Sequence, residues 1–176
     1  LDEIATQYDV LFCDLWGCVH NGQTAYPAAI SALQRFRRGG GRVVLLTNAP
    51  RPAKFIALQL QRLGVPGDAW DEIVSSGDAA QDAMFAGAVG HRVWAIAPDK
   101  DDGFFDDVPD EWKDARPIVK VSLDEAEGIV ATGPFDEDSE QASDYHDRLS
   151  LALNRGLKLL CANPDIVVDL GDRRII

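Results

Sequence analysis

The sequence has few basic residues, no long apolar run and only three cysteines. Lysine and arginine together number 17 against 29 aspartates and glutamates, so the formal net charge is −12. A surface this acidic repels the phosphate backbone of nucleic acids and the headgroups of anionic membranes, so neither is expected as a partner. A small anionic substrate remains compatible with this charge, because a local pocket can reverse the average field.

The cysteines, Cys13, Cys18 and Cys161, are odd in number and lack the spacing of a disulfide framework. This usage indicates reduced thiols in a cytoplasmic protein. No apolar run approaches the roughly 20 residues of a membrane span, and no secretory signal is visible at the start. Because the chain begins at Leu1 and ends abruptly at Ile176, we expect a processed or incomplete polypeptide.

The first half of the chain alternates short apolar runs with amphipathic segments. Strands are expected at residues 9–12, 42–46 and 72–75, and each is followed by a helix. This rhythm predicts a parallel sheet covered by helices, an α/β fold. Right-handed crossovers would bring the carboxyl ends of the strands to one edge, which is where open α/β sheets bind ligands.

The second half of the chain is less regular. Its apolar runs predict four further strands, at residues 93–97, 118–121, 129–132 and 157–162. A helix is expected to begin at Ser139. Residues 98–114 are acidic and contain Pro and Gly, so they predict a surface loop rather than a calcium site at Asp99, Asp101 and Asp102. The irregular residues 86–92 are the expected domain boundary.

The first candidate site is the segment FCDLWGCVHNG, residues 12–22. Asp14 directly follows a buried strand, and Gly17 permits a tight turn around it. The pair Asn21-Gly22 is typical of a hairpin turn. A carboxylate held in this way could act as a nucleophile or bind a hard metal ion. It could equally cap a neighbouring loop.

The second candidate site is LLTNAPRP, in which Thr47 and Asn48 follow the second strand as Asp14 follows the first. A hydroxyl and a backbone N–H at a strand end can hold phosphate oxygens opposite a carboxylate. The separation of Asp14 and Thr47 matches one crossover of a βαβ unit.

Together with VSSGDAA and CANPD, these motifs resemble the haloacid dehalogenase superfamily, and more narrowly its class IIA branch of NagD-like sugar and nucleotide phosphatases. The resemblance implies a Rossmann-like parallel sheet core with an inserted α/β cap domain. On this basis residues 1–88 would form the first part of the core and residues 89–165 the cap. Residues 166–176 would begin a truncated return to the core.

The resemblance also implies a chemistry, the Mg²⁺-dependent hydrolysis of the phosphomonoester of a small metabolite. Asp14 matches the nucleophile that forms an aspartyl-phosphate, and Thr47 and Asn48 match the groups that bind the phosphoryl oxygens. Mg²⁺ would be bound by the Asp14 carboxylate and the backbone carbonyl of Trp16. Secondary site candidates are His20, Ser76 and Asp165. A homodimer stays open as the oligomeric state.

Two features differ from the family pattern. Trp16 stands where the family usually carries an Asp that acts as general acid and base, and an indole N–H cannot do this work. Losing such help typically costs about 10²–10⁴ in rate. The family's phosphate-binding Lys and late acidic metal site lie beyond the cap return, and the chain ends before both. The alternative function is therefore a catalytically impaired phospholigand-binding or regulatory protein on the same fold.

Overall fold

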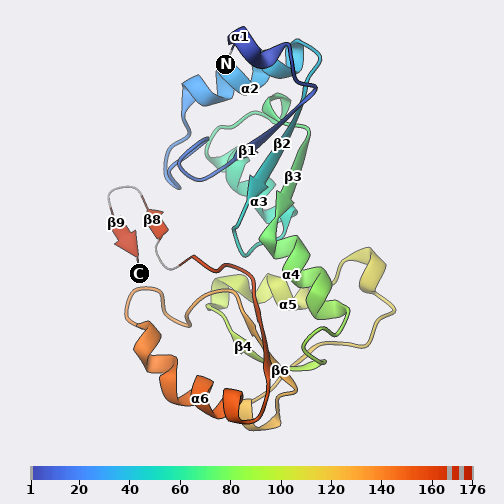
Figure 1. Ribbon diagram of the computed structural model, residues 1–176, viewed down its shortest axis with the longest axis vertical. Coiled ribbons are helices and arrows are strands. Elements are labelled where there is room, and N and C mark those ends of the chain that lie inside the picture. Colours follow the sequence, from blue (N-terminus) through green and yellow to red (C-terminus); the bar gives the residue numbers. More distant parts are fainter. Residues whose placement is uncertain (1, 166–167, 171–172, 176) are drawn as a thin grey trace.

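The computed structural model describes residues 2–165, 168–170 and 173–175. Two parallel sheets are joined by a helix, and a small antiparallel pair of strands follows them (Figure 1). After the short helix α1 (Asp2–Ala5), the first sheet has the order β1-β2-β3. Its strands are β1 (Val10–Asp14), β2 (Arg42–Thr47) and β3 (Glu72–Ser75). The strands and the parallel arrangement predicted from the alternating sequence are confirmed.

Helices α2 (Pro27–Arg38) and α3 (Ala53–Arg62) cover one face of this first sheet. Each helix has an apolar stripe at the spacing of a helix turn, which places its buried side chains on one side. Leu33 and Phe36 of α2 and Ile56 and Leu60 of α3 pack with Val43 and Leu45 in a single cluster. Burial of these stripes fixes both helices against the same face.

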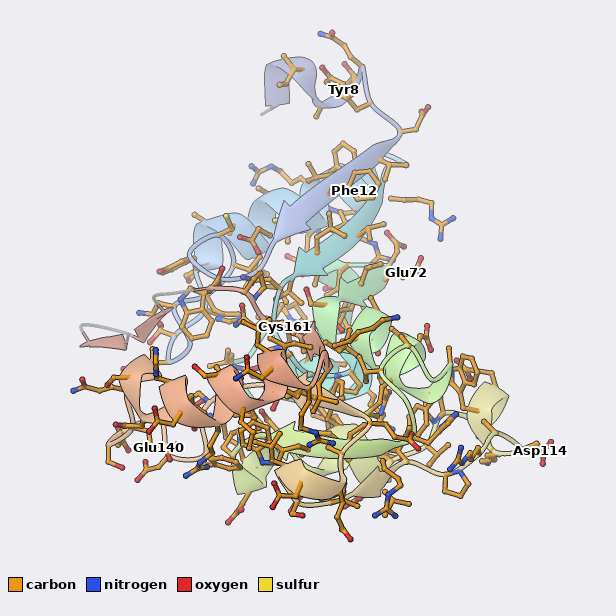
Figure 2. The ribbon with its side chains drawn as sticks, turned by 60° about the horizontal axis from the view of Figure 1, so that its bottom comes forward. Tyr8, Phe12, Glu72, Asp114, Glu140 and Cys161 are labelled. Carbon is orange, nitrogen blue, oxygen red and sulfur yellow. The ribbon has the colours of Figure 1, made fainter. Side chains whose placement is uncertain are left out.

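The opposite face of the first sheet carries exposed apolar side chains. Phe12 is 63% exposed, and Val10, Leu46 and Val74 are also exposed. Phe12 and Glu72 can be found in Figure 2, on the first and third strands. Parallel sheets are normally covered on both faces, so this face is unusual within the described residues.

The second sheet is also parallel and has the order β5-β4-β6-β7. Helix α4 (Ser76–Phe85) leads to it from β3. On one face, Met84 and Phe105 pack with Val93 and Val130. On the other face, helix α6 packs through Ala152. The strands are β4 (Arg92–Ile96), β5 (Val119–Lys120), β6 (Gly128–Ala131) and β7 (Lys158–Cys161), and α6 is His146–Asn154.

The prediction of a surface loop at residues 98–114 was wrong. This segment holds helix α5 (Asp102–Asp106) between the short 3₁₀ helices η2 (Asp99–Asp101) and η3 (Asp110–Trp112). Phe104 and Phe105 are buried against the second sheet, and Asp101 is buried as well. The acidic composition led to the prediction of a loop, but burial of Phe104 and Phe105 stabilises a short helix here.

The helix expected from Ser139 begins later. Gln141 and Asp144 form a reciprocal capping box at the start of η5 (Ala142–Tyr145), and η5 leads into α6. Such a box satisfies the first backbone N–H groups of a helical segment, so it sets the starting point.

The remaining elements are small. Residues Leu123–Glu125 form η4 and Gly67–Ala69 form η1. Strands β8 (Val168–Leu170) and β9 (Arg173–Ile175) pair antiparallel in the segment predicted to return to the core. Residues 166–167, 171–172 and 176 of that segment lie outside the described residues. In the described part of the chain, we find no helix long and apolar enough to cross a membrane.

Candidate active site

Asp14 is the last residue of β1 and begins a tight turn. The backbone N–H of Leu15 donates to Asp14 Oδ1 at 2.7 Å, which fixes one oxygen of the carboxylate. Cys18, Val19 and His20 all donate their backbone N–H groups to the carbonyl of Leu15. Gly17 has a φ of 74°, a conformation that residues with a side chain rarely adopt. The turn predicted around Asp14 is therefore present and internally hydrogen-bonded.

His20 lies inside this turn and is only 3% exposed. Its Nδ1 accepts a hydrogen bond from the backbone N–H of Gly22 at 3.0 Å, and its ring meets the indole of Trp16 edge-on at 5.5 Å. Burial lowers the pKa of His20 below its ordinary value, although the charge of Asp14 acts in the opposite direction. An Nδ1 that accepts belongs to the neutral ring, so His20 supports the turn.

Thr47 and Asn48 follow β2, next to the end of β1. Asp14 is paired in register with Leu46, so Thr47 lies one residue beyond that pair. The backbone N–H of Ala49 donates to Thr47 Oγ1 at 3.2 Å, which leaves the hydroxyl its own proton to donate. The side-chain amide of Asn48 donates to the Asp165 carboxylate, although the two residues are far apart in sequence. The structure thus brings Thr47, Asn48 and Asp165 together beside the strand that carries Asp14.

Ser76 lies in the first turn of α4, and the polar contacts there come from its neighbours. Ser75 is the N-cap, because its hydroxyl accepts from the backbone N–H of Asp78 at 3.0 Å. The Asp78 carboxylate accepts from the backbone N–H of Ala53, which begins α3. Sequence reasoning missed this contact. The spacing of Ser75 and Asp78 is typical of a capping box in α4, but it does not indicate that Asp78 also contacts the first residue of α3.

The loop after β2 also contacts the second sheet. Arg51 Nε lies 3.5 Å from Asp101 Oδ1, and the other oxygen of Asp101 accepts from the Thr132 hydroxyl at 2.9 Å. The side chain of Asp101 is 3% exposed. Nearby, Lys54 Nζ lies 2.5 Å from Asp107 Oδ2. The expectation that Asp101 belongs to a solvated acidic loop was wrong, since this carboxylate is buried between the two sheets.

A model of the haloacid dehalogenase-like hydrolase family matches residues 11–108, more than half of the chain, and this span includes Asp14, Thr47 and Asn48. The chain belongs to this family. The family resemblance predicted from the sequence motifs is therefore confirmed. Among curated proteins, the comparison found no match.

Solved structures share the fold of this haloacid dehalogenase-like chain across both sheets. A haloacid dehalogenase-like hydrolase from Brucella suis has 38% identity and a TM-score of 0.88, over 99% of this chain and 63% of that one. A 4-nitrophenylphosphatase from Thermotoga maritima has 16% identity and a TM-score of 0.67, with 98% and 61% covered. A glycerol phosphate phosphatase from Mycobacterium tuberculosis, in complex with magnesium, has 23% identity and a TM-score of 0.66, with 98% and 49% covered. The chain thus spans less than two thirds of each of these proteins.

The oxygen atoms near Asp14 are of the kind that Mg²⁺ prefers, namely carboxylate and backbone carbonyl. The Asp14 carboxylate and the Trp16 carbonyl come from the same short turn, which its internal hydrogen bonds hold in place. In the part of the chain that the structure describes, no three His, Cys, Asp or Glu residues gather into a metal cluster. In this haloacid dehalogenase-like site, two protein groups would suit Mg²⁺, namely the Asp14 carboxylate and the Trp16 carbonyl. Water or substrate oxygens would supply the other ligands.

Cys13 precedes Asp14 and is not an activated nucleophile. Burial raises the pKa of the Cys13 thiol to about 11, and the neighbouring Cys18 and Asp14 act in the same direction. Because the thiolate is the reactive form of cysteine, Cys13 is inert near neutral pH. The carboxylate of Asp14 remains the nucleophile candidate in this haloacid dehalogenase-like chain.

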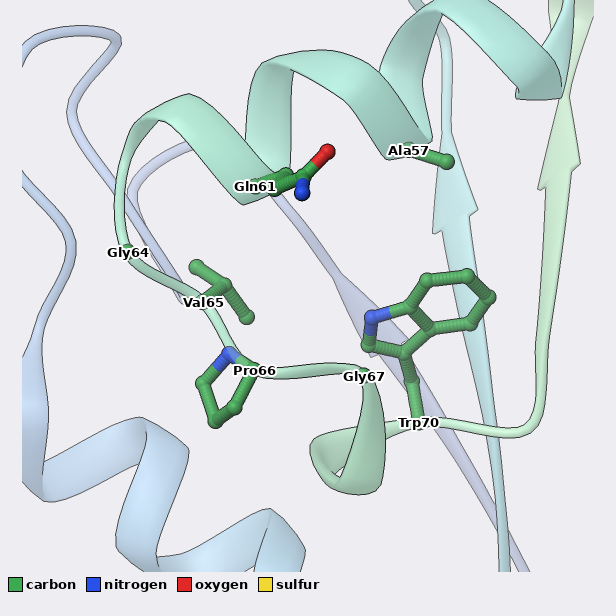
Figure 3. Close-up of a pocket in the computed structure, with 7 residues that line it drawn as sticks. All are labelled: Ala57, Gln61, Gly64, Val65, Pro66, Gly67 and Trp70. Carbon is green, nitrogen blue, oxygen red and sulfur yellow. The ribbon is translucent and has the colours of Figure 1, made fainter.

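A hollow of about 490 Å³ lies in the first sheet domain, away from the carboxyl ends of the strands that carry Asp14 and Thr47 (Figure 3). It is formed by the end of α3 and the segment that precedes β3, so it lies near the amino ends of the strands. Trp70 lines it, and its buried indole N–H has no hydrogen-bond partner among the residues that the structure describes. A second hollow of about 370 Å³ lies in the second sheet region and is lined by Asp99, Lys120 and Phe135 among others.

Proposed function

We propose that this protein is a Mg²⁺-dependent phosphomonoester hydrolase that acts on a small phosphorylated metabolite. The observation that carries the proposal is the placement of Asp14 and the Thr47–Asn48 pair at the carboxyl ends of two adjacent parallel strands. Ligands bind at this edge in open α/β sheets. Membership of a hydrolase family and the shared fold of two phosphatases support the same chemistry.

In the first step, a carboxylate oxygen of Asp14 attacks phosphorus and the bond between phosphorus and the ester oxygen breaks. The ester oxygen takes a proton from water and leaves as the alcohol. The hydrogen bond from Leu15 N to Oδ1 orients the carboxylate, so its other oxygen is the attacking atom. Water then cleaves the aspartyl-phosphate and releases inorganic phosphate. The Thr47 hydroxyl and the Asn48 backbone N–H hold phosphoryl oxygens, which stabilises the charge that spreads over them.

Mg²⁺, when bound, supplies positive charge that neutralises the phosphoryl oxygens, and the Asp14 carboxylate and Trp16 carbonyl would hold it. Asp165 acts indirectly in this proposal. Its carboxylate engages the side chain of Asn48, which orients the backbone of Asn48 toward the substrate. His20 and Ser76 stay outside the reacting groups, because His20 supports the turn and Ser76 lies within the first turn of α4.

Trp16 favours a second candidate function, a phospholigand-binding protein with little turnover. Its indole packs edge-on against His20, so the position that would hold a general acid is part of the packing of the turn. Without a group to protonate the leaving oxygen, hydrolysis would be fast only for esters with weakly basic leaving groups.

The test is a panel of phosphomonoesters assayed with Mg²⁺ on the full-length protein. We expect Asp14→Asn to lower kcat by at least about 10³-fold, because it removes the nucleophile. The matched control is Asp9→Asn, which makes the same charge change at the other end of β1. Beryllium fluoride should bind the unchanged protein and not Asp14→Asn. Turnover that survives Asp14→Asn contradicts the proposal. Tight binding of beryllium fluoride without turnover favours the second function.

We further propose the organisation that the sequence motifs predict, with residues 1–88 in the core, residues 89–165 in the cap and residues 166–176 returning to the core. We propose a cytoplasmic protein whose cap excludes water from Asp14 and selects the leaving group. Gel filtration of the full-length protein would distinguish a monomer from a homodimer.

A further inference from the structure

The Asp78 carboxylate caps a helix to which it does not belong. Both of its oxygens lie 3.1 Å from the backbone nitrogen of Ala53, the first residue of α3. The residue at the N-cap of α3 is Pro52, whose side chain has no acceptor and therefore makes no capping hydrogen bond. The first N–H groups of a helix have no partner within the helix. Asp78 therefore supplies from α4 the acceptor that α3 lacks.

The backbone of the same loop lies directly on the first turn of α4. The N–H of Gly77 donates to the carbonyl of Ala49 at 3.1 Å. A Cβ atom added at Gly77 would lie 2.2 to 2.4 Å from backbone atoms of Arg51, closer than packed atoms can approach. Only glycine leaves room for this contact. The segment from Ala49 to Ala53 is thus fixed by two neighbouring residues of α4.

The Asp78 carboxylate is itself held in place. The Ser75 hydroxyl donates to Asp78 Oδ2 at 2.9 Å, and the same hydroxyl accepts from the backbone N–H of Asp78. Replacing the Asp78 side chain leaves this second bond intact, since it uses only the backbone of residue 78. A truncated side chain at this position therefore keeps the backbone hydrogen bond that caps α4, and it loses the contact with α3 together with the hydrogen bond from the Ser75 hydroxyl.

We infer that Asp78 is a positioning residue for the phosphate-binding loop, residues 47–53, and this inference rests on the proposed function. The loop joins β2 to α3. The sheet pairing of Thr47 holds its first residue, and Asp78 holds its last residue, Ala53, next to the contact of Gly77 with Ala49. Releasing Ala53 lets Thr47 and Asn48 move relative to Asp14. A displacement of about 1 Å in such groups is enough to cost about 10²-fold in rate.

The experiment compares Asp78→Ala, Asp78→Asn and Asp68→Ala in the full-length protein, well below the Tm of every variant. Asn keeps an oxygen that can accept from Ala53 N. Asp68→Ala is the matched control, because it also removes a carboxylate that accepts a hydrogen bond, here from Gln34 Nε2 on the surface of the same sheet domain. The measurements are kcat and KM for p-nitrophenyl phosphate, the inhibition constant of inorganic phosphate, and amide hydrogen exchange at Ala53.

We expect Asp78→Ala to lower kcat/KM by about 10-fold or more, to weaken inhibition by phosphate, and to speed exchange at Ala53. Asp78→Asn should recover most of these three effects, and Asp68→Ala should stay within about twofold of the unchanged protein in each. Equal activity in Asp78→Ala and Asp68→Ala overturns the inference, as does unchanged exchange at Ala53. If the unchanged protein neither turns over esters nor binds phosphate, the proposed function fails, and exchange at Ala53 still tests whether Asp78 holds the loop.

Discussion

His20 illustrates how a residue near the nucleophile can be structural. The sequence made it a secondary site candidate, in the segment that follows Asp14. In the structure it is buried, accepts from Gly22 N and packs against Trp16. Trp16 and His20 stabilise the same turn, so the residue that replaces the family's usual acid has a packing role of its own.

The buried His20 predicts a loss of stability in acid. Its folded-state pKa lies below the ordinary value of 6.5, so the unfolded chain binds the extra proton first as the pH falls. The contribution of His20 is therefore complete above about pH 6.5 and is lost as the pH falls from there through the lowered folded-state pKa. Denaturant unfolding measured from pH 7.5 to pH 5 should show this slope.

The slope should be smaller in His20→Gln, which can still accept from Gly22 N and does not titrate. His146→Gln is the control, since it makes the same substitution at an exposed histidine. Identical slopes in the unchanged protein and His20→Gln would contradict the role of His20.

At the scale of elements, the first turn of α4 determines where the loop after β2 lies. Gly77 makes this contact possible because it has no side chain. We expect Gly77→Ala to lower the free energy of unfolding by about 1–3 kcal/mol, the usual cost of forcing a methyl group into a packed site. Urea unfolding measures this change.

Gly67→Ala is the control for Gly77→Ala. A Cβ at Gly67 would meet no atom within 4 Å, so this change should be nearly neutral. If the two variants are equally stable, the loop is not packed against α4 as described.

At the scale of the whole molecule, a buried carboxylate joins the two sheets. Asp101 is almost fully buried and its nearest cation is Arg51, which is itself partly exposed. We expect Arg51→Ala to cost about 1–3 kcal/mol of stability, since it leaves a buried charge without its partner. Thermal or urea unfolding checks the value.

Two variants sharpen this prediction. Adding Asp101→Asn to Arg51→Ala should recover part of the loss, because the neutral amide carries no charge to desolvate. Lys113→Ala removes a pair in which both side chains are largely exposed, and it should cost less than about 1 kcal/mol. Additive losses in the double variant would show that Arg51 and Asp101 do not act together.

The uncovered face of the first sheet also belongs to this scale. This chain covers 63% of the relative from Brucella suis, so we propose that further polypeptide packs on Phe12 and its neighbours in the whole protein. Phe12→Ser should make residues 1–176 more soluble when they are produced alone, because an exposed aromatic ring is removed. The same change should destabilise the full-length protein by about 3 kcal/mol or more, a typical cost of losing a buried aromatic side chain.

Unfolding of the full-length protein with and without Phe12→Ser measures this effect. An equal, small effect in both lengths of chain would show that the face stays open. Leu153→Ser is a matched control, because Leu153 is highly exposed on α6 and the second sheet is already covered on that side.

The sequence alone was sufficient for the strands of the two parallel sheets, for the helices that cover the first sheet and for the family. These features are local: an apolar stripe or a buried run reports which side of a segment faces the core. Asp14, Thr47 and Asn48 could be predicted because parallel strands must end at a common edge. Helix α5 was not predicted. Its only large apolar residues are two adjacent phenylalanines among acidic residues, and such a pair does not show the spacing that distinguishes a helix from a loop.

The contacts of Asp78, Arg51 and Asp165 depend on the tertiary fold. Asp78 meets Ala53 across 25 residues of chain, and Asn48 meets Asp165 across 117. No periodicity encodes such pairs, because each depends on how two separately formed elements pack. Asp101 is a further example. Its charge led us to expect an exposed side chain, but the carboxylate is buried because Arg51 and Thr132 lie against it in the folded chain. Local patterns decide which face of a segment is buried, and packing decides which residues meet there.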